Sequence, residues 1–280
     1  MNHVSRLRLA WSLTAGVALL CGCNAGGESG GKTSSGSGGG TPAGSGTDSG
    51  SGGINLTVGS GGSISGSGGS ADCSGGLTVV VRDFTTSNKD FEPGISADDT
   101  GIVLPDLGAD GKPVYAGNPT TPTTHGKESF DQWYRDVDGV NKNIPIKIQL
   151  TEGAGGIFTY DNQKFFPIDG QGFGDEGNPH NYHFTNEVHT KFTYKGGESF
   201  TFSGDDDLFG YVNKKLVINL GGIHSAQTKT LDLDKLADEL GLKIGGTYSL
   251  DLFGAERHVT ESHYRIDTTI SCFVDVPPAK

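Results

Sequence analysis

The chain has 280 residues, of which glycine supplies 47, about 17% against a usual share of about 7%. Hydrophobic residues make up only 33%, so part of the chain lacks the apolar side chains that a packed core requires. The formal net charge of −12 argues against a nucleic-acid partner, because an acidic protein repels phosphate backbones.

The glycine excess is confined to one stretch of the chain. In residues 25–70, 31 of 46 positions are Gly or Ser, and such a sequence has almost nothing to bury on folding. We therefore expect residues 23–72 to form a disordered Gly/Ser-rich tether. Residues 73–280 carry the whole net charge, with 18 basic and 30 acidic side chains, and they are long enough for one domain with its own core.

Residues 1–22 have the pattern of a secretory signal peptide. Arg6 and Arg8 precede an apolar run, Leu9–Leu20, that is too short to span a membrane. The signal ends at Gly22-Cys23, which resembles a bacterial lipobox, where a small residue precedes the cysteine that becomes acylated. The resemblance implies cleavage before Cys23, a lipid on its thiol and an exported protein. Because Asn24 is not Asp, the inner-membrane retention signal of enteric bacteria is absent, which favours an anchor in the outer membrane or cell surface. The alternative is an ordinary secretory signal without a lipid.

Two cysteines remain once the signal is removed and Cys23 is acylated. They are Cys73 and Cys272, one near each end of the domain. The compartment beyond the inner membrane is oxidising, so we expect a disulfide between them, with two free thiols as the alternative.

The domain begins with a predicted strand over residues 77–82, because β-branched side chains run through the sequence LTVVVR. A long polar segment, residues 85–124, follows. Loops of this length usually have a role, so we expect this one either to carry a functional site or to cover part of the domain. Residues 129–136 predict a short helix that packs aromatic side chains into the core, with a capping box from Ser129 to Gln132.

The second half of the domain is predicted to consist mainly of short strands. They lie at residues 144–150, 157–160, 181–194, 199–203, 247–253 and 262–273, with a hairpin over 209–220. The hairpin turns at Asn213-Lys214, and a short helix over 231–240 begins near Asp232 or Asp234 and stops at Gly241. This pattern predicts an all-β fold, an antiparallel β-sandwich or barrel with two short helices.

The densest polar feature is Asp205-Asp206-Asp207, in a turn between two predicted strands. Three adjacent carboxylates repel one another, so water or a cation must screen them. Ca²⁺ accepts several such oxygens at once, which makes Asp205 and Asp206 candidate metal ligands. A solvated acidic turn is the alternative.

The sequence contains no motif that predicts an enzyme. The histidines at positions 183, 224, 258 and 263 lack zinc-type spacing, and neither HExxH nor CxxC occurs. We therefore expect these histidines to be structural. GxSxG is also absent, and a polysaccharide hydrolase is the least favoured function because no nucleophile–base pair is visible.

Nine segments between residues 77 and 272 resemble the fibro-slime domain family, in the family's order. They are Val81–Phe84, Asp90–Glu92, Leu107–Tyr115, Phe130–Asp136, Phe165–Gly170, Asn181–Thr185, Phe200–Asp207, Lys215–His224 and Ala255–His258. This family is related to the lectin-like β-barrel first named in anthrax protective antigen. The resemblance implies that fold for residues 73–280.

The resemblance also implies a site. In the lectin members, an Asp-Asp pair joined by a cis peptide binds Ca²⁺, and the ion and neighbouring loops bind sugar hydroxyls. Asp205-Asp206 match that pair, which implies a calcium cofactor. Further candidates for ligand contact are Asp207, Asn219, His224 and Glu256. Lys214 departs from the family, which usually has Gly at that position of the turn.

Taken together, these features predict a surface-anchored bacterial lipoprotein with a calcium-dependent carbohydrate-binding or adhesion domain. Its partners would be an extracellular glycan or matrix polysaccharide, and the membrane through the lipid anchor. The alternative is a structural surface or extracellular-matrix protein without a glycan site. Binding that a chelator abolishes would favour the first function, and self-assembly independent of glycan would favour the second.

Overall fold

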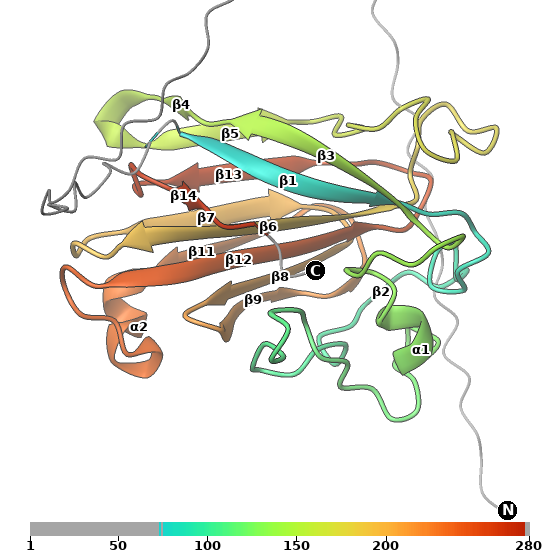
Figure 1. Ribbon diagram of the computed structural model, residues 1–280, viewed down its shortest axis with the longest axis horizontal. Coiled ribbons are helices and arrows are strands. Elements are labelled where there is room, and N and C mark those ends of the chain that lie inside the picture. Colours follow the sequence, from blue (N-terminus) through green and yellow to red (C-terminus); the bar gives the residue numbers. More distant parts are fainter. Residues whose placement is uncertain (1–72, 74, 278–280) are drawn as a thin grey trace, which may run out of the picture. The chain divides into compact units, whose positions relative to one another are not determined.

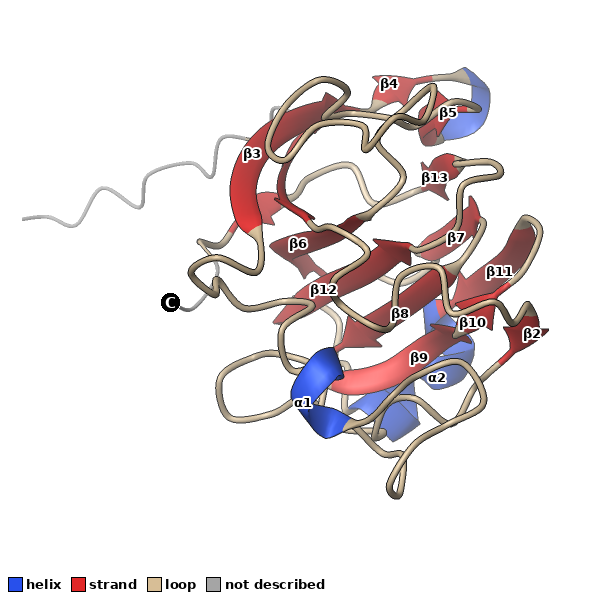
Figure 2. Ribbon diagram, turned by 90° about the vertical axis from the view of Figure 1, so that its right-hand side faces the viewer, coloured by secondary structure: helices blue, strands red, loops and turns tan. Residues whose placement is uncertain are grey.

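The computed structural model describes residues 73 and 75–277, and within them two antiparallel β-sheets form two layers (Figures 1 and 2). The first sheet contains β1 (Gly76–Asp83), β3 (Lys142–Gln149), β6 (Phe184–Thr193), β8 (Asp207–Val212), β9 (Lys215–Leu220), β12 (Thr247–Glu256) and β14 (Val274–Asp275). Its strand order is β3-β1-β6-β12-β8-β9, and β14 also pairs with β6.

The second sheet and the remaining short elements complete the domain. This sheet contains β4 (Thr151–Glu152), β5 (Phe158–Asn162), β7 (Ser199–Gly204), β11 (Gln227–Asp232) and β13 (Tyr264–Thr268), in the order β11-β7-β13-β5-β4. A separate pair joins β2 (Ala97–Asp98) to β10 (Gly222–Ile223). The helices are α1 (Lys127–Phe130) and α2 (Leu233–Leu240), and a single 3₁₀ turn covers Ala154–Gly156. The predicted all-β antiparallel fold is confirmed.

The main core lies between the two sheets, because alternate side chains of each strand point to the same face. The buried residues of this core include Val79, Val81, Phe184, Val188, Leu250 and Leu252 from the first sheet, and Phe200, Phe202 and Ile266 from the second. The expected disulfide joins Cys73 to Cys272 across a sequence separation of 199. It ties the chain before β1 to the chain after β13.

A second core covers the other face of the first sheet. The side chains that form it are Phe209, Tyr211, Phe253 and Ala255 from β8 and β12, and Ile102, Val103, Tyr115, Phe130, Trp133 and Tyr134 from the segment between β1 and β3. Because the sheet is covered on both faces, all six residues of β8 are buried. The long polar segment 85–124 is therefore a cover for the sheet, and Figure 2 shows α1 and its flanking loops outside it.

Two expected details differ in the structure. Helix α1 begins at Lys127 after Gly126 and has no side-chain cap, so the predicted Ser129–Gln132 capping box is wrong. The Ser129 hydroxyl instead donates to Asn88 Oδ1 at 2.7 Å, which removes it from the helix terminus. Of the predicted strand over 262–273, only Tyr264–Thr268 is extended, as β13 in the second sheet. The chain then leaves that sheet, and β14 begins beyond the predicted range, at Val274, where it pairs with β6 in the first sheet.

The hairpin and the second helix form as expected. Asn213 and Lys214 turn the β8–β9 hairpin with φ of +49° and +67°. Helix α2 has Asp232 as its N-cap and ends at Gly241 in the left-handed conformation. The predicted signal peptide, the acylated Cys23 and the tether lie outside the described residues. No described helix is long and apolar enough to span a membrane.

Candidate functional site

The predicted metal ligands lie at one end of the strands, in the turn between β7 and β8. A cavity of about 480 Å³ opens there. Its lining residues are Ser96, Asp205, Asp206, Ile223, His224, Ser225, His258, Thr260 and Glu261. The fold therefore brings Asp205, Asp206 and His224 together, and adds the loop that follows β12.

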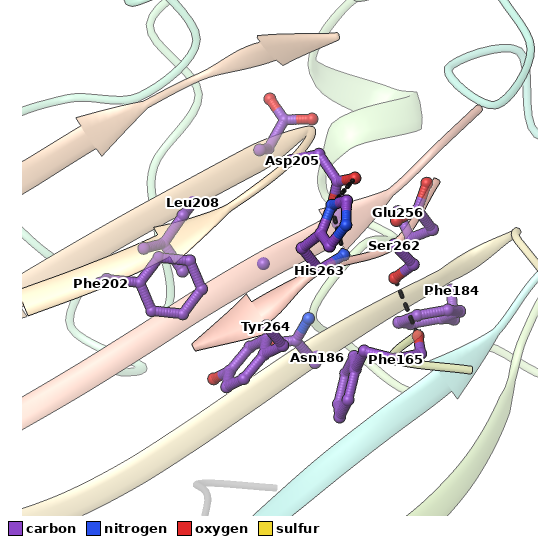
Figure 3. A pocket seen from close by; sticks show the side chains of 13 residues that line it. Phe165, Phe184, Asn186, Phe202, Asp205, Leu208, Glu256, Ser262, His263 and Tyr264 are labelled. Atoms are coloured by element: carbon purple, nitrogen blue, oxygen red, sulfur yellow. Dashed lines mark hydrogen bonds and ion pairs between the residues drawn. The ribbon is translucent and has the colours of Figure 1, made fainter. Parts of the chain in front are cut away.

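Asp205 is held by His263 from the loop between β12 and β13. Its Oδ1 accepts from the His263 backbone N–H at 2.6 Å, and its Oδ2 lies 3.0 Å from His263 Nδ1. Glu261 Oε2 is 3.9 Å from the same nitrogen. One ligand-type atom from each of Asp205, Glu261 and His263 lies within 4.8 Å of the others, close enough to share a metal ion. Figure 3 shows His263 against Asp205, with Glu256 and Ser262 beside them.

Asp206 lies deeper than Asp205 and in a different conformation. It has φ of +49°, and its Oδ2 accepts the Arg257 backbone N–H at 2.8 Å. No described residue donates to its Oδ1. Within the described residues the cis peptide bond is Asn118–Pro119, so the Asp205–Asp206 bond is trans and the cis pair implied by the resemblance is absent. The left-handed backbone of Asp206 makes the tight turn instead.

Several carboxylates at this end of the fold lie near one buried cation, the Arg257 guanidinium, and their pKa values are shifted as a result. Burial raises the pKa of Asp206 to about 7, and repulsion from Asp207 adds to this although Arg257 opposes it. Burial, together with the charges of Asp206 and Asp205, raises the pKa of Glu256 well above its usual value. Glu256 Oε1 is buried and has no hydrogen-bond partner among the described residues. A bound cation would oppose these shifts by stabilising the ionised carboxylates.

The remaining sequence-predicted residues do not line this cavity. Asp207 is fully buried and accepts from Arg257 Nε at 2.6 Å and from the Gly222 N–H at 2.7 Å. It therefore joins β8 to β10 and to the loop that follows β12. Asn219 donates from Nδ2 to the carbonyl of Thr100 at 2.9 Å. Glu256 lines a much smaller neighbouring cavity of about 10 Å³, which has room for about one water molecule.

Sequence analysis missed two residues of the site, Glu261 and His263. They lie in an irregular loop that carries no ligand motif, and His263 is 58 residues from Asp205. Only the pairing of β13 with β7, which sets Tyr264 opposite Gly204, brings this loop to the acidic turn. No local signal in the sequence could have found them.

The fold and the site together define an antiparallel β-sandwich with an acidic cavity at one end of its strands. No family model matches the chain. Protein psiQ of Dictyostelium discoideum is 41% identical over 199 residues, which cover 65% of this chain and 20% of psiQ. Protein psiD of the same organism is 42% identical over 185 residues, which cover 61% of this chain and 36% of psiD. The chain thus spans between a fifth and just over a third of these two relatives.

Two solved structures are similar at low scores. The PA14 domain of the antifreeze protein MpAFP has a TM-score of 0.32 and 8% identity, over 68% of this chain and 79% of that domain. The PA14 sugar-binding domain from an RTX adhesin has a TM-score of 0.28 and 15% identity, over 69% of this chain and 88% of that domain.

Proposed function

We propose that this domain binds an extracellular glycan or matrix polysaccharide in a calcium-dependent manner and serves in adhesion. The observation that carries the proposal is the crowding of carboxylates around one open cavity. Asp205, Asp206 and Glu261 line it, and Asp206 Oδ1 has no donor among the described residues. Ca²⁺ takes about six to eight oxygen ligands in flexible geometry, so these side chains suit it.

The cavity also suits a sugar. Its volume of about 480 Å³ lies within the range of about 300–1,000 Å³ that is usual for small-molecule sites. His224, Ser225 and Thr260 add polar side chains to its wall. A calcium ion held by Asp205 and Asp206 would accept vicinal sugar hydroxyls at its open coordination positions, and these polar side chains would hydrogen-bond the rest of the ring.

Calcium binding is the first test of this proposal. We expect calorimetry on the purified protein to show one Ca²⁺ with a Kd on the order of 10⁻⁴–10⁻³ M, as in other extracellular modules. The double variant Asp205→Asn/Asp206→Asn should lose it, and Glu261→Gln, whose side chain is 62% exposed, should weaken binding without disturbing the fold. Asp138→Asn is the matched control, because Asp138 is exposed and remote in sequence from the site.

A glycan array with and without chelator then tests the ligand. Binding to particular glycans that chelator and the double variant both abolish would support the proposal. A folded protein that binds neither Ca²⁺ nor glycan would contradict it and favour the structural surface protein.

We also propose that the chain is exported and anchored by a lipid on Cys23. The Cys73–Cys272 disulfide supports export, because disulfides persist in oxidising compartments. Metabolic labelling of the expressed protein with a fatty-acid analogue should mark the wild-type chain and not Cys23→Ser. Equal labelling of both, or of neither, would contradict the anchor.

A further inference from the structure

A second group of metal-type side chains, two histidines and a glutamate, meets at the loop that follows β12. His183 Nε2 lies 3.6 Å from Glu92 Oε1, and His258 Nε2 lies 3.6 Å from Glu92 Oε2. Backbone contacts fix the carboxylate between them: the Glu92 N–H donates to the Arg257 carbonyl at 2.9 Å, and the Val259 N–H donates to Glu92 Oε1 at 2.7 Å. Glu92 comes from the loop after β1, His183 immediately precedes β6, and His258 lies in the loop after β12.

The hydrogen bonds of His183 determine which of its nitrogens is free. Its Nδ1 lies 2.6 Å from Glu176 Oε2. An ionised carboxylate can only accept, so Nδ1 carries the proton. His183 is 3% exposed, and its Nε2 is buried with no hydrogen-bond partner among the described residues. This nitrogen faces Glu92 Oε1 at 3.6 Å, and either a proton or a metal ion between the two atoms would relieve the repulsion of their lone pairs.

The spacing fits a metal ion better than a hydrogen bond. At 3.6 Å both contacts with Glu92 exceed the usual N–H···O range of about 2.7–3.2 Å. Two ligands that each lie about 2.0–2.1 Å from a tetrahedral Zn²⁺ are about 3.4 Å apart. In known metal sites the second ring nitrogen of a metal-bound histidine usually donates to a carboxylate, which orients the ring. The contact between His183 Nδ1 and Glu176 Oε2 has the same arrangement. Glu92 and Glu176 both have left-handed backbones, with φ of +54° and +49°, at the two sides of His183.

We propose that Glu92, His183 and His258 bind a divalent transition metal of the Zn²⁺ class, with Glu176 orienting His183. The imidazole nitrogens distinguish this site from the oxygen-only Ca²⁺ site of the proposed function. Within the described residues only Asp205, Glu261 and His263 have ligand atoms that all lie within 4.8 Å of one another, and the two imidazoles of the proposed site face different oxygens of Glu92. The proposal therefore requires the loop that carries His258 to move toward His183 when the ion binds. Three protein ligands leave one tetrahedral position for water or another ligand.

Zinc binding to the purified protein tests the proposal, with calorimetry for affinity and the visible absorption of Co²⁺ as a second readout. We expect one Zn²⁺ per chain at this site. His183→Gln and His258→Gln should each weaken it by more than about 100-fold, and Glu176→Gln by roughly 10–100-fold. His180→Gln is the matched control, because His180 pairs with Asp169 and stacks on Phe166 away from Glu92. His258, with a side chain 27% exposed, provides a variant that should fold even if loss of buried His183 does not allow folding.

The outcomes separate this site from the calcium site. Retention of Zn²⁺ in Asp205→Asn/Asp206→Asn, together with retention of Ca²⁺ in His183→Gln, would show two independent sites. Loss of Zn²⁺ in His263→Gln with full binding in the His183 and His258 variants would move the metal to the Asp205–Glu261–His263 cluster and overturn the proposal. Absence of Zn²⁺ and Co²⁺ binding to the folded wild-type protein would overturn it as well.

Discussion

Arg257 and Asp207 form an ion pair in the interior of the domain, with Nε and Oδ2 2.6 Å apart and neither side chain exposed. The same guanidinium donates to the carbonyls of Asp90 at 3.1 Å and Thr123 at 2.8 Å, and it lies 4.8 Å from the centre of the Trp133 ring. One side chain thus connects the end of β12 to β8 and to the segment that covers the first sheet.

Removal of this guanidinium should be strongly destabilising. Arg257→Met leaves the Asp207 carboxylate buried without its partner, which costs about 3–5 kcal/mol in comparable cases. Arg265→Met is the control, because Arg265 pairs with Asp161 and Asp267 but its side chain is 41% exposed, and such pairs contribute about 1 kcal/mol or less. Urea unfolding measures both, and equal losses would contradict the structural role of Arg257.

A buried charge network around Glu187 should make the domain sensitive to acid. Glu187 accepts from Arg82 at 2.6 Å and from Lys112 and His189. Burial alone would raise its pKa, but the His189 hydrogen bond and the two cations hold the pKa of Glu187 at about 2. The ionised group therefore contributes stability above about pH 4.5 that is lost as the pH falls toward 2, by roughly 3 kcal/mol in all.

The matching test is the pH dependence of the free energy of unfolding for wild type and Glu187→Gln. The difference between the two should shrink as the pH falls from 5 to 2. The pKa of His189 is raised because, although burial opposes it, Asp251 and Glu187 accept its hydrogen bonds. The protonated form of His189 therefore contributes to the stability of the domain below about pH 6.5, and this contribution is lost as the pH rises through the raised pKa of His189. Parallel pH profiles for wild type and Glu187→Gln would contradict this account.

The strands could be predicted from the sequence because their signals are local. The LTVVVR run, the Asn213-Lys214 turn and the Gly241 stop each depend on a few adjacent residues, and each is present in the structure. The capping box at Ser129 could not be predicted correctly, since the hydroxyl bonds to Asn88, which is 41 residues away. The Ser129 side chain thus bonds to a residue distant in sequence rather than to the helix terminus beside it.

The two candidate metal sites show the same limit. Asp205 and Asp206 are adjacent, so their crowding is visible in the sequence. His183 and His258 lack any zinc-type spacing, and the sequence therefore indicated structural histidines. They meet at Glu92 only because β6 and β12 pair, with Phe184 opposite Glu256. Sequence motifs for metal ligands detect residues that are close together in one segment, whereas the proposed ligands Glu92, His183 and His258 come from three separate segments.

The Cys73–Cys272 disulfide should contribute a large part of the stability of the domain. It closes a loop with a sequence separation of 199, for which chain-entropy models give about 5 kcal/mol, and removal of native disulfides from small secreted domains costs about 2–5 kcal/mol. Cys73→Ser/Cys272→Ser should lower the free energy of unfolding by about 2–5 kcal/mol and so lower the unfolding midpoint. A reductant should lower the midpoint of wild type but not that of the double variant. A midpoint that neither change shifts would contradict the prediction.

The β8–β9 turn offers a substitution that should stabilise the protein. Lys214 has φ of +67°, a left-handed conformation that costs a residue with a Cβ about 1–2 kcal/mol relative to Gly. Lys214→Gly should therefore raise the free energy of unfolding by up to about 1 kcal/mol, because the greater freedom of glycine in the unfolded chain offsets part of the gain. Lys229→Gly, at an exposed position within β11, is the opposite control and should destabilise the protein, since glycine weakens a strand interior. Thermal unfolding of the two variants beside wild type measures both effects, and a loss of stability in Lys214→Gly would show that the side chain does more than occupy a strained turn.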